Sequence, residues 1–137
     1  MRIVASERGL QRLDWSDEPS VGPRALVDAA EAQLAEYFAG RRRKFELALD
    51  PGGTAFQQRA WLALAEIPYG ETRTYAEQAR RLGLERGARA VGSANARNPL
   101  PIVIPCHRLV GAGGALTGYA GGLDRKARLL RLEGARP

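Results

Sequence analysis

The spacing of hydrophobic and polar residues predicts a small α/β unit in the first 50 residues. Alternating apolar residues at 2–6 and 10–15 flank a tight turn with Gly9 in the left-handed region, which is typical of a β-hairpin. Between residues 25 and 38 the apolar positions recur with helical spacing, and residues 45–49 alternate again. We therefore expect a small antiparallel sheet, with 45–49 as its third strand, and one helix.

The rest of the chain is predicted to be mainly helical. A Pro-Gly-Gly break at 51–53 is followed by capping boxes that begin at Thr54 and Thr74, and each of them opens a helix. The second of these helices and another at 86–96 are joined by a short glycine-containing turn, which is the spacing of a helix-turn-helix. An amphipathic helix over 123–132, with Leu123, Ala127 and Leu130 inward, closes the pattern.

This pattern indicates an α/β (α+β) chain with two domains, residues 1–50 and 51–137. A length of 137 residues suits one compact unit or two small subdomains. No apolar run approaches the ~20 residues that span a bilayer, and residues 1–9 do not resemble a secretory signal. A single cysteine excludes a disulfide framework, so we expect a cytoplasmic protein with no membrane attachment.

Positive charge is concentrated in the last third of the chain. Residues 1–85 carry 12 basic and 13 acidic side chains, whereas residues 86–137 carry 9 basic and 2 acidic ones. All but two of the 21 basic residues are Arg, the type that pairs bidentately with phosphate. Nucleic acid is therefore an expected partner, and a merely solvated face in an arginine-rich chain is the open alternative.

The single cysteine and the single histidine are neighbours, Cys106 and His107. Two such ligands cannot fill a structural zinc site, which takes about four, so no metal is expected. A thiolate is a strong nucleophile, and a nearby base or positive charge favours its formation. Because neighbouring side chains of an extended segment point to opposite faces, a turn or a bridging water must connect these two. The open alternative is an inert buried cysteine beside a surface histidine.

Three further side chains could take part in an active site. Glu133 follows the last predicted helix and could orient an imidazole, or it could pair at the surface with an arginine of that helix. Tyr75 lies in the first turn of a helix and could donate a proton or simply pack. Arg89 could enter a groove or stack, or it could remain solvated. The segment 111–122 holds six glycines and predicts a loop whose backbone is approached closely.

Several segments together resemble one family of DNA repair proteins. They are Arg89-Ala90-Val91-Gly92, Asn98-Pro99, Ile104-Pro105-Cys106-His107-Arg108, Gly118-Tyr119-Ala120-Gly121-Gly122 and Leu129-Leu130-Arg131-Leu132-Glu133-Gly134. Upstream runs of the same kind are Gly53 to Trp61, Ile67-Pro68-Tyr69-Gly70 and Thr74-Tyr75. The chain is similar to the O6-alkylguanine-DNA alkyltransferases densely over about residues 53–134 and more loosely over 1–50.

The resemblance implies direct reversal of DNA damage, in which the alkyl group of O6-alkylguanine passes irreversibly to a cysteine of the protein. Cys106 would be the acceptor, His107 would take its proton through a water, and Glu133 would orient His107. Asn98 would hold the active-site loop by hydrogen bonds, and Tyr75 would donate a proton to the guanine. The pocket for the guanine would be completed by Leu109, Tyr119 and Ala120. The family implies no cofactor.

The resemblance also implies double-stranded DNA as the partner, a winged-type helix-turn-helix, and extrusion of the damaged base from the duplex. Arg89 would fill the vacated stack while its helix enters the minor groove. The residues expected to face DNA are Arg89, Ala88, Ala90, Gly92, Ser93, Ala96 and Arg97. We expect a monomer, with cooperative assembly on DNA left open.

The chain departs from the family pattern in a few places. It starts at what resembles the family's second strand, so 1–50 is expected to be a shortened form of a ribonuclease H-like subdomain. Leu84-Glu85 replaces the usual polar residue and proline before the second helix, and Ala120 stands where some members have Ser. The N-terminal zinc ligands of some members are absent.

Other functions fit the sequence less well. The main alternative is a non-catalytic lesion-binding protein of the alkyltransferase-like type, which flags damage for another repair pathway. Such proteins replace the cysteine, whereas Cys106 is present. A plain helix-turn-helix regulator would leave the Cys-His-Arg segment unexplained, and the site resembles no family of cysteine hydrolases.

Overall fold

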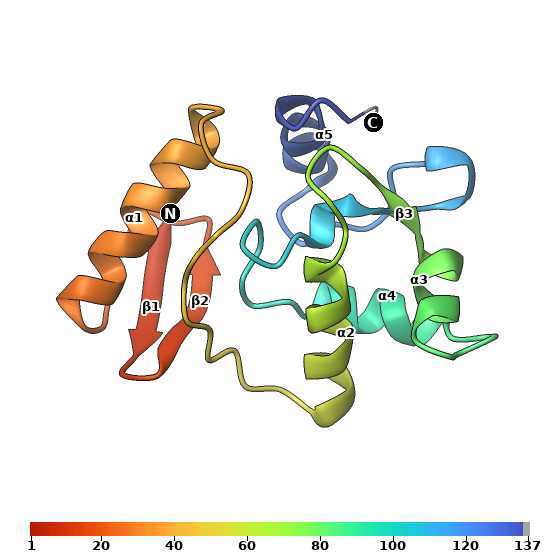
Figure 1. The fold of residues 1–137 in the computed structure, drawn as a ribbon, viewed down its shortest axis with the longest axis horizontal. Coiled ribbons are helices and arrows are strands. Elements are labelled where there is room, and N and C mark those ends of the chain that lie inside the picture. The colour runs from red at the N-terminus through yellow and green to blue at the C-terminus, as the bar shows by residue number, and fades with distance from the viewer. Residues whose placement is uncertain (136–137) are drawn as a thin grey trace. The chain divides into compact units, whose positions relative to one another are not determined.

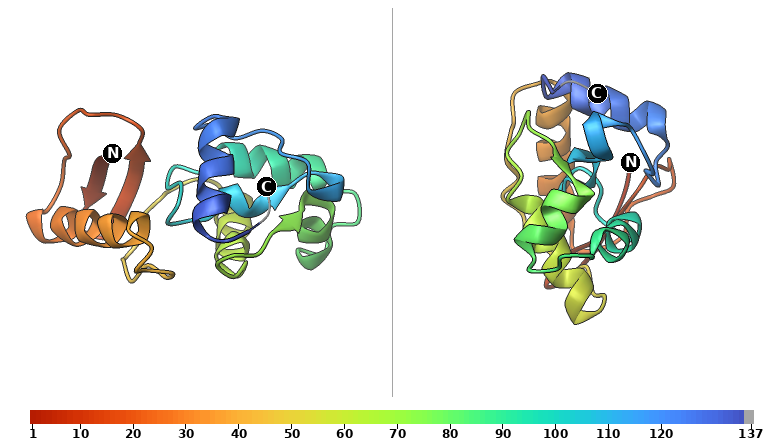
Figure 2. Two further views of the ribbon diagram at one scale, coloured as in Figure 1. Left: turned by 90° about the horizontal axis from the view of Figure 1, so that it is seen from above. Right: turned by 90° about the vertical axis from the view of Figure 1, so that its right-hand side faces the viewer.

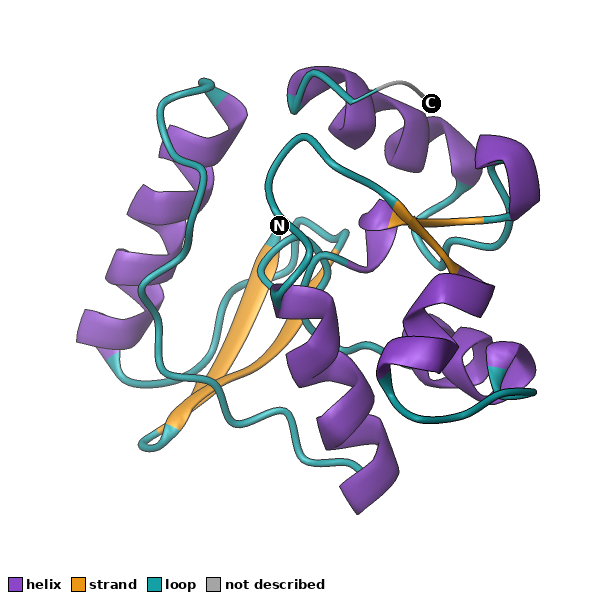
Figure 3. Ribbon diagram, turned by 45° about the vertical axis from the view of Figure 1, so that its right-hand side comes forward, coloured by secondary structure: helices purple, strands orange, loops and turns teal. Residues whose placement is uncertain are grey.

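The computed structural model describes residues 1–135 and divides the chain into two compact units, Met1–Gly53 and a second that begins at Thr54 (Figure 1). The first unit contains a hairpin and one long helix. The second is mainly helical, with short strands and two single 3₁₀ turns (Figure 3). These two units give the α+β class that the sequence predicts.

In the first unit, β1 (Arg2–Ser6) and β2 (Gly9–Asp14) form the predicted antiparallel hairpin, and α1 (Arg24–Phe38) packs against β1. The helix ends where Gly40 takes a φ of +76°, a backbone conformation that glycine adopts without strain. The buried residues of this unit are Ile3, Ala5, Leu10, Leu13, Val27, Ala30, Leu34 and Tyr37. Burial of this apolar set is what stabilises the hairpin and helix together.

Two details of the hairpin prediction are wrong. Gly9 has a φ of +151° and begins β2 instead of taking the left-handed helical conformation in the turn. A Cβ at this position would lie 2.5 Å from the Ala48 carbonyl oxygen, so a close approach of backbone requires the glycine. Residues 45–49 do not form a third strand. Only an isolated bridge between Leu10 and Leu49 joins this segment to β2, and Phe45 instead packs on the Tyr37 ring at 5.6 Å.

The second unit begins with α2 and contains the helix-turn-helix. Its elements are α2 (Ala55–Ala65), β3 (Arg73–Thr74), α3 (Tyr75–Arg81), α4 (Ala88–Ala96), η1 (Cys106–Arg108), β4 (Leu109–Val110), η2 (Ala112–Gly114) and α5 (Leu123–Leu132). Among residues 1–135, no helix is both long enough and apolar enough to cross a membrane.

Both predicted capping boxes are confirmed. The Thr54 hydroxyl accepts from the backbone of Gln57 and the Gln57 side chain accepts from the backbone of Thr54. Thr74 and Glu77 form the same reciprocal pair at the start of α3. Such caps satisfy backbone N–H groups that a helix start otherwise leaves without partners. The local sequence thus determines where α2 and α3 begin.

Packing within the second unit places η1 close to three helices. α3 packs against α4, and the Trp61 indole of α2 donates a hydrogen bond to the Ala94 carbonyl of α4 at 2.8 Å. β3 pairs in parallel with β4, which follows η1 directly, and α5 packs on η1 (Figures 1 and 2). The short pair β3–β4 therefore joins the start of the helix-turn-helix to the segment that contains Cys106.

Two predictions about the helices of this unit need correction. The helix expected over 86–96 begins two residues later, at Ala88, with Gly87 as its N-cap, where a Cβ would lie 2.5 Å from the Leu84 Cβ. In α5, Leu123 is 47% exposed instead of inward. The buried stripe of α5 consists of Lys126, Leu129 and Leu130, and it continues to Glu133.

Candidate active site

Cys106 lies at the start of the 3₁₀ turn η1, and two asparagines from the end of α4 hold this segment. The Asn95 amide donates to the carbonyl oxygen of Cys106 at 3.3 Å. The Asn98 amide donates to the carbonyl oxygen of Ile104 at 2.8 Å, and its own oxygen accepts from the backbone N–H of Leu100 at 2.9 Å. The second helix of the helix-turn-helix is thereby fixed to the backbone of the candidate nucleophile.

The Cys106 thiol is buried, with 4% of the residue exposed. Burial raises the pKa of this thiol, because it disfavours the thiolate. Hydrogen bonding to the Asn98 amide, the charge of Lys126 and the Tyr119 hydroxyl each lower the pKa. A thiol in this setting needs a base to remove its proton and a positive charge to stabilise the resulting thiolate.

A base lies beside it in sequence, in a buried group of three charged or titratable side chains. His107 Nε2 lies 2.7 Å from Oε2 of Glu133, and both side chains are fully buried. Arg108 donates to the same carboxylate twice, from Nε to Oε1 at 2.8 Å and from Nη2 to Oε2 at 3.0 Å. Burial lowers the pKa of His107, and this effect outweighs the opposing one of Glu133. The imidazole is therefore neutral near pH 7, with one nitrogen able to accept a proton.

These contacts decide two alternatives that the sequence leaves open. His107 is buried and not at the surface, and Cys106 and His107 lie in the same 3₁₀ turn, η1. Glu133 is buried as well and pairs with His107 and Arg108, not with an exposed arginine of α5. The Nδ1 atom of His107 is buried and makes no hydrogen bond to any residue in 1–135.

A buried lysine completes the polar surroundings of Cys106. Lys126 of α5 is fully buried, and its Nζ donates to the Thr117 carbonyl at 2.8 Å and lies 5.9 Å from the centre of the Tyr75 ring. Burial lowers the pKa of Lys126 to about 8, against the opposing effect of Cys106. The Tyr75 hydroxyl donates to the same Thr117 carbonyl at 3.4 Å. The helix-turn-helix, the glycine-rich loop and α5 thus meet around the thiol.

The three residues predicted to line the guanine pocket follow Cys106 in the sequence and differ in their exposure to solvent. Leu109 is fully buried in β4, whereas Ala120 is exposed. The Tyr119 hydroxyl is buried, and burial raises its pKa. Tyr119 also interacts electrostatically with the Cys106 thiol.

Helix α4 presents most of the predicted DNA-facing residues to solvent. Its buried side is formed by Val91, Ala94 and Asn95. The exposed residues are Ala88, Arg89, Ala90, Ser93, Ala96 and Arg97, and Gly92 is half-buried near the Tyr75 ring. All predicted contact residues therefore lie off the buried side of the helix, and the surface they form is made of small side chains with two arginines.

Three residues of the site were missed by the sequence reasoning, which gave no role to Arg108, Lys126 or Asn95. For Arg108 the adjacent Pro-Cys-His segment was a usable signal. A lysine at a helical position is usually solvated, and no pattern in the sequence marks Lys126 as buried. The buried face of α4 in this structure is what identifies Asn95.

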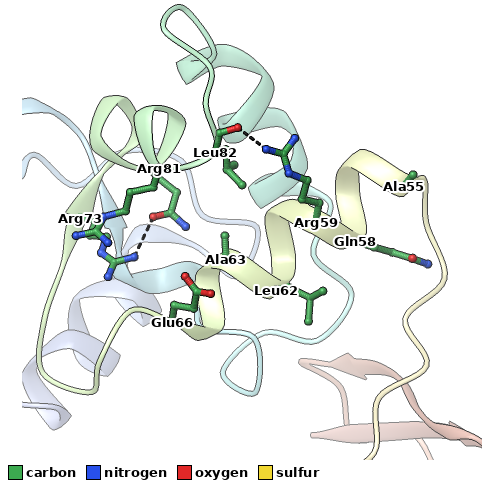
Figure 4. A pocket seen from close by; sticks show the side chains of 10 residues that line it. Ala55, Gln58, Arg59, Leu62, Ala63, Glu66, Arg73, Arg81 and Leu82 are labelled. Atoms are coloured by element: carbon green, nitrogen blue, oxygen red, sulfur yellow. Dashed lines mark hydrogen bonds between the residues drawn. The ribbon is translucent and has the colours of Figure 1, made fainter.

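A hollow of about 460 Å³ lies between α2 and α3 (Figure 4). Arg59 donates to the Leu82 carbonyl on one side of it, and Arg73 donates to the Gln78 side chain on the other. Its lining residues are Ala55, Gln58, Arg59, Leu62, Ala63, Glu66, Arg73, Gln78, Arg81 and Leu82. None of the predicted site residues lines this hollow.

Comparison with known proteins shows the family of this chain. A family model described as "6-O-methylguanine DNA methyltransferase, DNA binding domain" matches residues 55–135. The chain belongs to this family. The methylated-DNA–protein-cysteine methyltransferase of Mycolicibacterium paratuberculosis is 54% identical over 133 residues, which cover 97% of this chain and 78% of that protein.

Solved structures of this methyltransferase family share the fold. Mycobacterium tuberculosis O6-methylguanine methyltransferase matches with a TM-score of 0.82 and 42% identity, covering 99% of this chain and 93% of that one. M. tuberculosis OGT in complex with DNA matches with a TM-score of 0.81 and 47% identity, covering 97% and 83%. Because these matches cover 97–99% of the chain, the structural similarity extends over both units.

Proposed function

We propose that the protein repairs double-stranded DNA by moving the alkyl group of O6-alkylguanine onto Cys106 in one irreversible turnover. The observation that carries this proposal is the buried thiol beside the His107–Glu133–Arg108 group. Two facts about relatives support it. One is named a methylated-DNA–protein-cysteine methyltransferase, and the structure of another was solved in complex with DNA.

The reaction is a displacement at carbon. The proton of the Cys106 thiol passes through a water to Nδ1 of His107, and Glu133 accepts the hydrogen bond from Nε2 and stabilises the imidazolium. The thiolate attacks the alkyl carbon, so that an S–C bond forms as the C–O6 bond breaks. The thioether has no route back to a thiol, and each molecule therefore acts once.

The guanine leaves as an anion and needs a proton and hydrogen bonds. Tyr75 would supply the proton, and the hydrogen bond from its hydroxyl to the Thr117 carbonyl in the glycine-rich loop is consistent with this role. The buried ammonium of Lys126 adds positive charge where negative charge moves from sulfur to the base. Leu109, Tyr119 and Ala120 would contact the guanine through backbone and ring atoms.

The exposed side of α4 would bind the duplex. Small residues such as Ala90 and Ser93 let a helix approach the minor groove closely, and the arginines contact phosphate or replace the extruded base. A base inside a duplex must leave the stack before its O6 substituent can reach a buried thiol. We also expect the protein to be a cytoplasmic monomer.

One experiment tests the proposed function. The protein is mixed with a duplex that contains a single O6-methylguanine, and the mass of the peptide that contains Cys106 is measured. We expect one methyl group per protein molecule on this peptide and restoration of guanine in the DNA. Binding to the damaged duplex without an adduct would instead favour the lesion-binding alternative, which the presence of Cys106 disfavours.

The role of Arg89 is tested by comparing two substrates. Arg89→Ala should slow repair of O6-methylguanine in a duplex by about tenfold, which corresponds to about 1.4 kcal/mol, because the vacated stack is no longer filled. Alkyl transfer from the free base O6-methylguanine should be unchanged, since no base has to be extruded. The control is Arg128→Ala, which removes an exposed arginine from α5. Equal losses on duplex and free base would contradict the stack-filling role.

A further inference from the structure

Arg108 is a charged residue buried in the site, and the reaction steps above do not use it. Only 6% of the residue is exposed, and its guanidinium is fixed by several contacts. Nη1 donates to the Ile67 carbonyl at 2.6 Å, and the guanidinium carbon lies 5.7 Å from the centre of the Tyr69 ring. Nε and Nη2 donate to the two different oxygens of the Glu133 carboxylate. Its position is thus set independently of His107.

A buried carboxylate has two states that differ in their effect on a neighbouring imidazole. When Glu133 is ionised it only accepts hydrogen bonds, so the Nε2 atom of His107 at 2.7 Å must carry a proton. When a carboxyl group is protonated it can donate to Nε2, and the proton of a neutral imidazole then moves to Nδ1. Burial without a partner favours the protonated carboxyl group, and a bidentate guanidinium favours the ionised one.

The site contains an atom for which this difference matters. Nδ1 of His107 is buried and has no hydrogen-bond partner among residues 1–135, so it is free to accept a proton delivered by a water. An Nδ1 that already carries a proton could not do so. The other charges that act on His107 are those of Glu133 and Lys126, and Lys126, like Arg108, disfavours a second proton on the ring.

From this arrangement we propose that Arg108 is a positioning residue: it keeps Glu133 ionised, and the ionised Glu133 fixes the His107 tautomer with the proton on Nε2 and a lone pair on Nδ1. Loss of the guanidinium charge removes this lone pair by either available route. If Glu133 becomes protonated, the neutral imidazole carries its proton on Nδ1. If Glu133 stays ionised without Arg108, it attracts a second proton to the imidazole, and both nitrogens are protonated.

The chain is suited to a direct test, because His107 is its only histidine. In the 15N-labelled protein at pH 7 without DNA, the two imidazole nitrogens are distinguished by their couplings to the ring protons. We expect the wild-type protein to show a protonated Nε2 and an unprotonated Nδ1. In Arg108→Met we expect Nδ1 to be protonated. Arg108→Lys keeps a positive charge and should retain the wild-type tautomer.

Controls separate this effect from unfolding. Arg131→Met removes an exposed arginine from α5 and should leave the imidazole signals unchanged. If Arg108→Met does not fold, Arg108→Gln replaces it, because its neutral amide nitrogen lies near the position of Nε and can still donate to the Glu133 carboxylate. A folded Arg108→Met or Arg108→Gln with the wild-type tautomer overturns the proposal. Protonation of Nδ1 in Arg108→Lys also overturns it, since charge would then not be the cause.

The expected tautomer of His107 does not depend on the proposed function, but the expected effect on the reaction rate rests on it. With Nδ1 protonated, methyl transfer to Cys106 should slow by about 100-fold or more, the usual contribution of a general base. If the tautomer changes and the rate does not, the placement of Arg108 stands and the proton route through His107 is wrong. The NMR spectrum therefore tests the role of Arg108, and the rate of methyl transfer separately tests the proton route through His107.

Discussion

Cys106→Ala is expected to abolish methyl transfer completely while leaving affinity for duplex DNA within about twofold. The loss is complete because the chain contains no other cysteine, and alanine offers no nucleophile. Affinity should persist because Cys106 is buried, whereas the surface expected to bind DNA lies on the exposed side of α4. Intact mass after incubation with the methylated duplex measures transfer, and a fluorescence titration at fixed salt measures affinity.

A second substitution checks that packing is not the cause. Cys106→Ser is close in size to the thiol and keeps a hydrogen-bonding group near Asn98, so its stability should match that of the wild-type protein more closely than Cys106→Ala. Transfer should still be lost, because a serine hydroxyl is a far weaker nucleophile than a thiolate. If either variant lost DNA binding together with transfer, Cys106 would be holding the helix-turn-helix in place instead of reacting.

The helices were predictable because their ends are encoded locally. The reciprocal caps at Thr54 and Thr74 require only residues three positions apart, and both occur as the sequence indicates. The segment 45–49 shows the opposite case. Its alternation is real, since Phe45 and Leu47 are half-buried, but strand formation needs a partner along its whole length and the segment forms only one bridge to β2, at Leu49. Alternating apolar residues in a sequence thus indicate which side chains are buried, whereas tertiary contacts determine whether the segment forms the hydrogen bonds of a β-sheet.

The candidate site shows the same limit in its charged residues. Cys106, His107 and Glu133 could be singled out by their chemistry, and the structure brings the last two within hydrogen-bonding distance. Lys126 could not be singled out, because its burial in α5 depends on the loop carbonyl of Thr117 that accepts a hydrogen bond from its ammonium group. The helical pattern placed Leu123 on the inner face instead, which is wrong. The prediction assumes that the buried stripe of a helix is apolar, and α5 departs from this assumption because Lys126 lies in its buried stripe.

Glu133 offers the largest expected effect on stability. Its carboxylate accepts hydrogen bonds from two nitrogens of Arg108 and lies against His107, and all three side chains are buried. In Glu133→Gln the shape is kept, but one oxygen becomes an NH2 group that faces other donors, and the Arg108 charge loses its partner. Removing one partner of a buried ion pair costs about 3–5 kcal/mol. We expect a decrease of this size in the free energy of unfolding, measured by urea denaturation at pH 7.

A matched control exists in the same unit. Glu66 is the C-cap residue of α2 as Glu133 is of α5, and both have the same αR backbone conformation. Both therefore experience the same unfavourable end of a helix dipole, worth about 0.3–1 kcal/mol, but Glu66 is exposed. Glu66→Gln removes only this dipole effect, so it should raise the free energy of unfolding by no more than about 1 kcal/mol. A similarly small change in Glu133→Gln would mean that the buried group contributes little to stability. The role of the Glu133 carboxylate would then be limited to its effect on the protonation of His107.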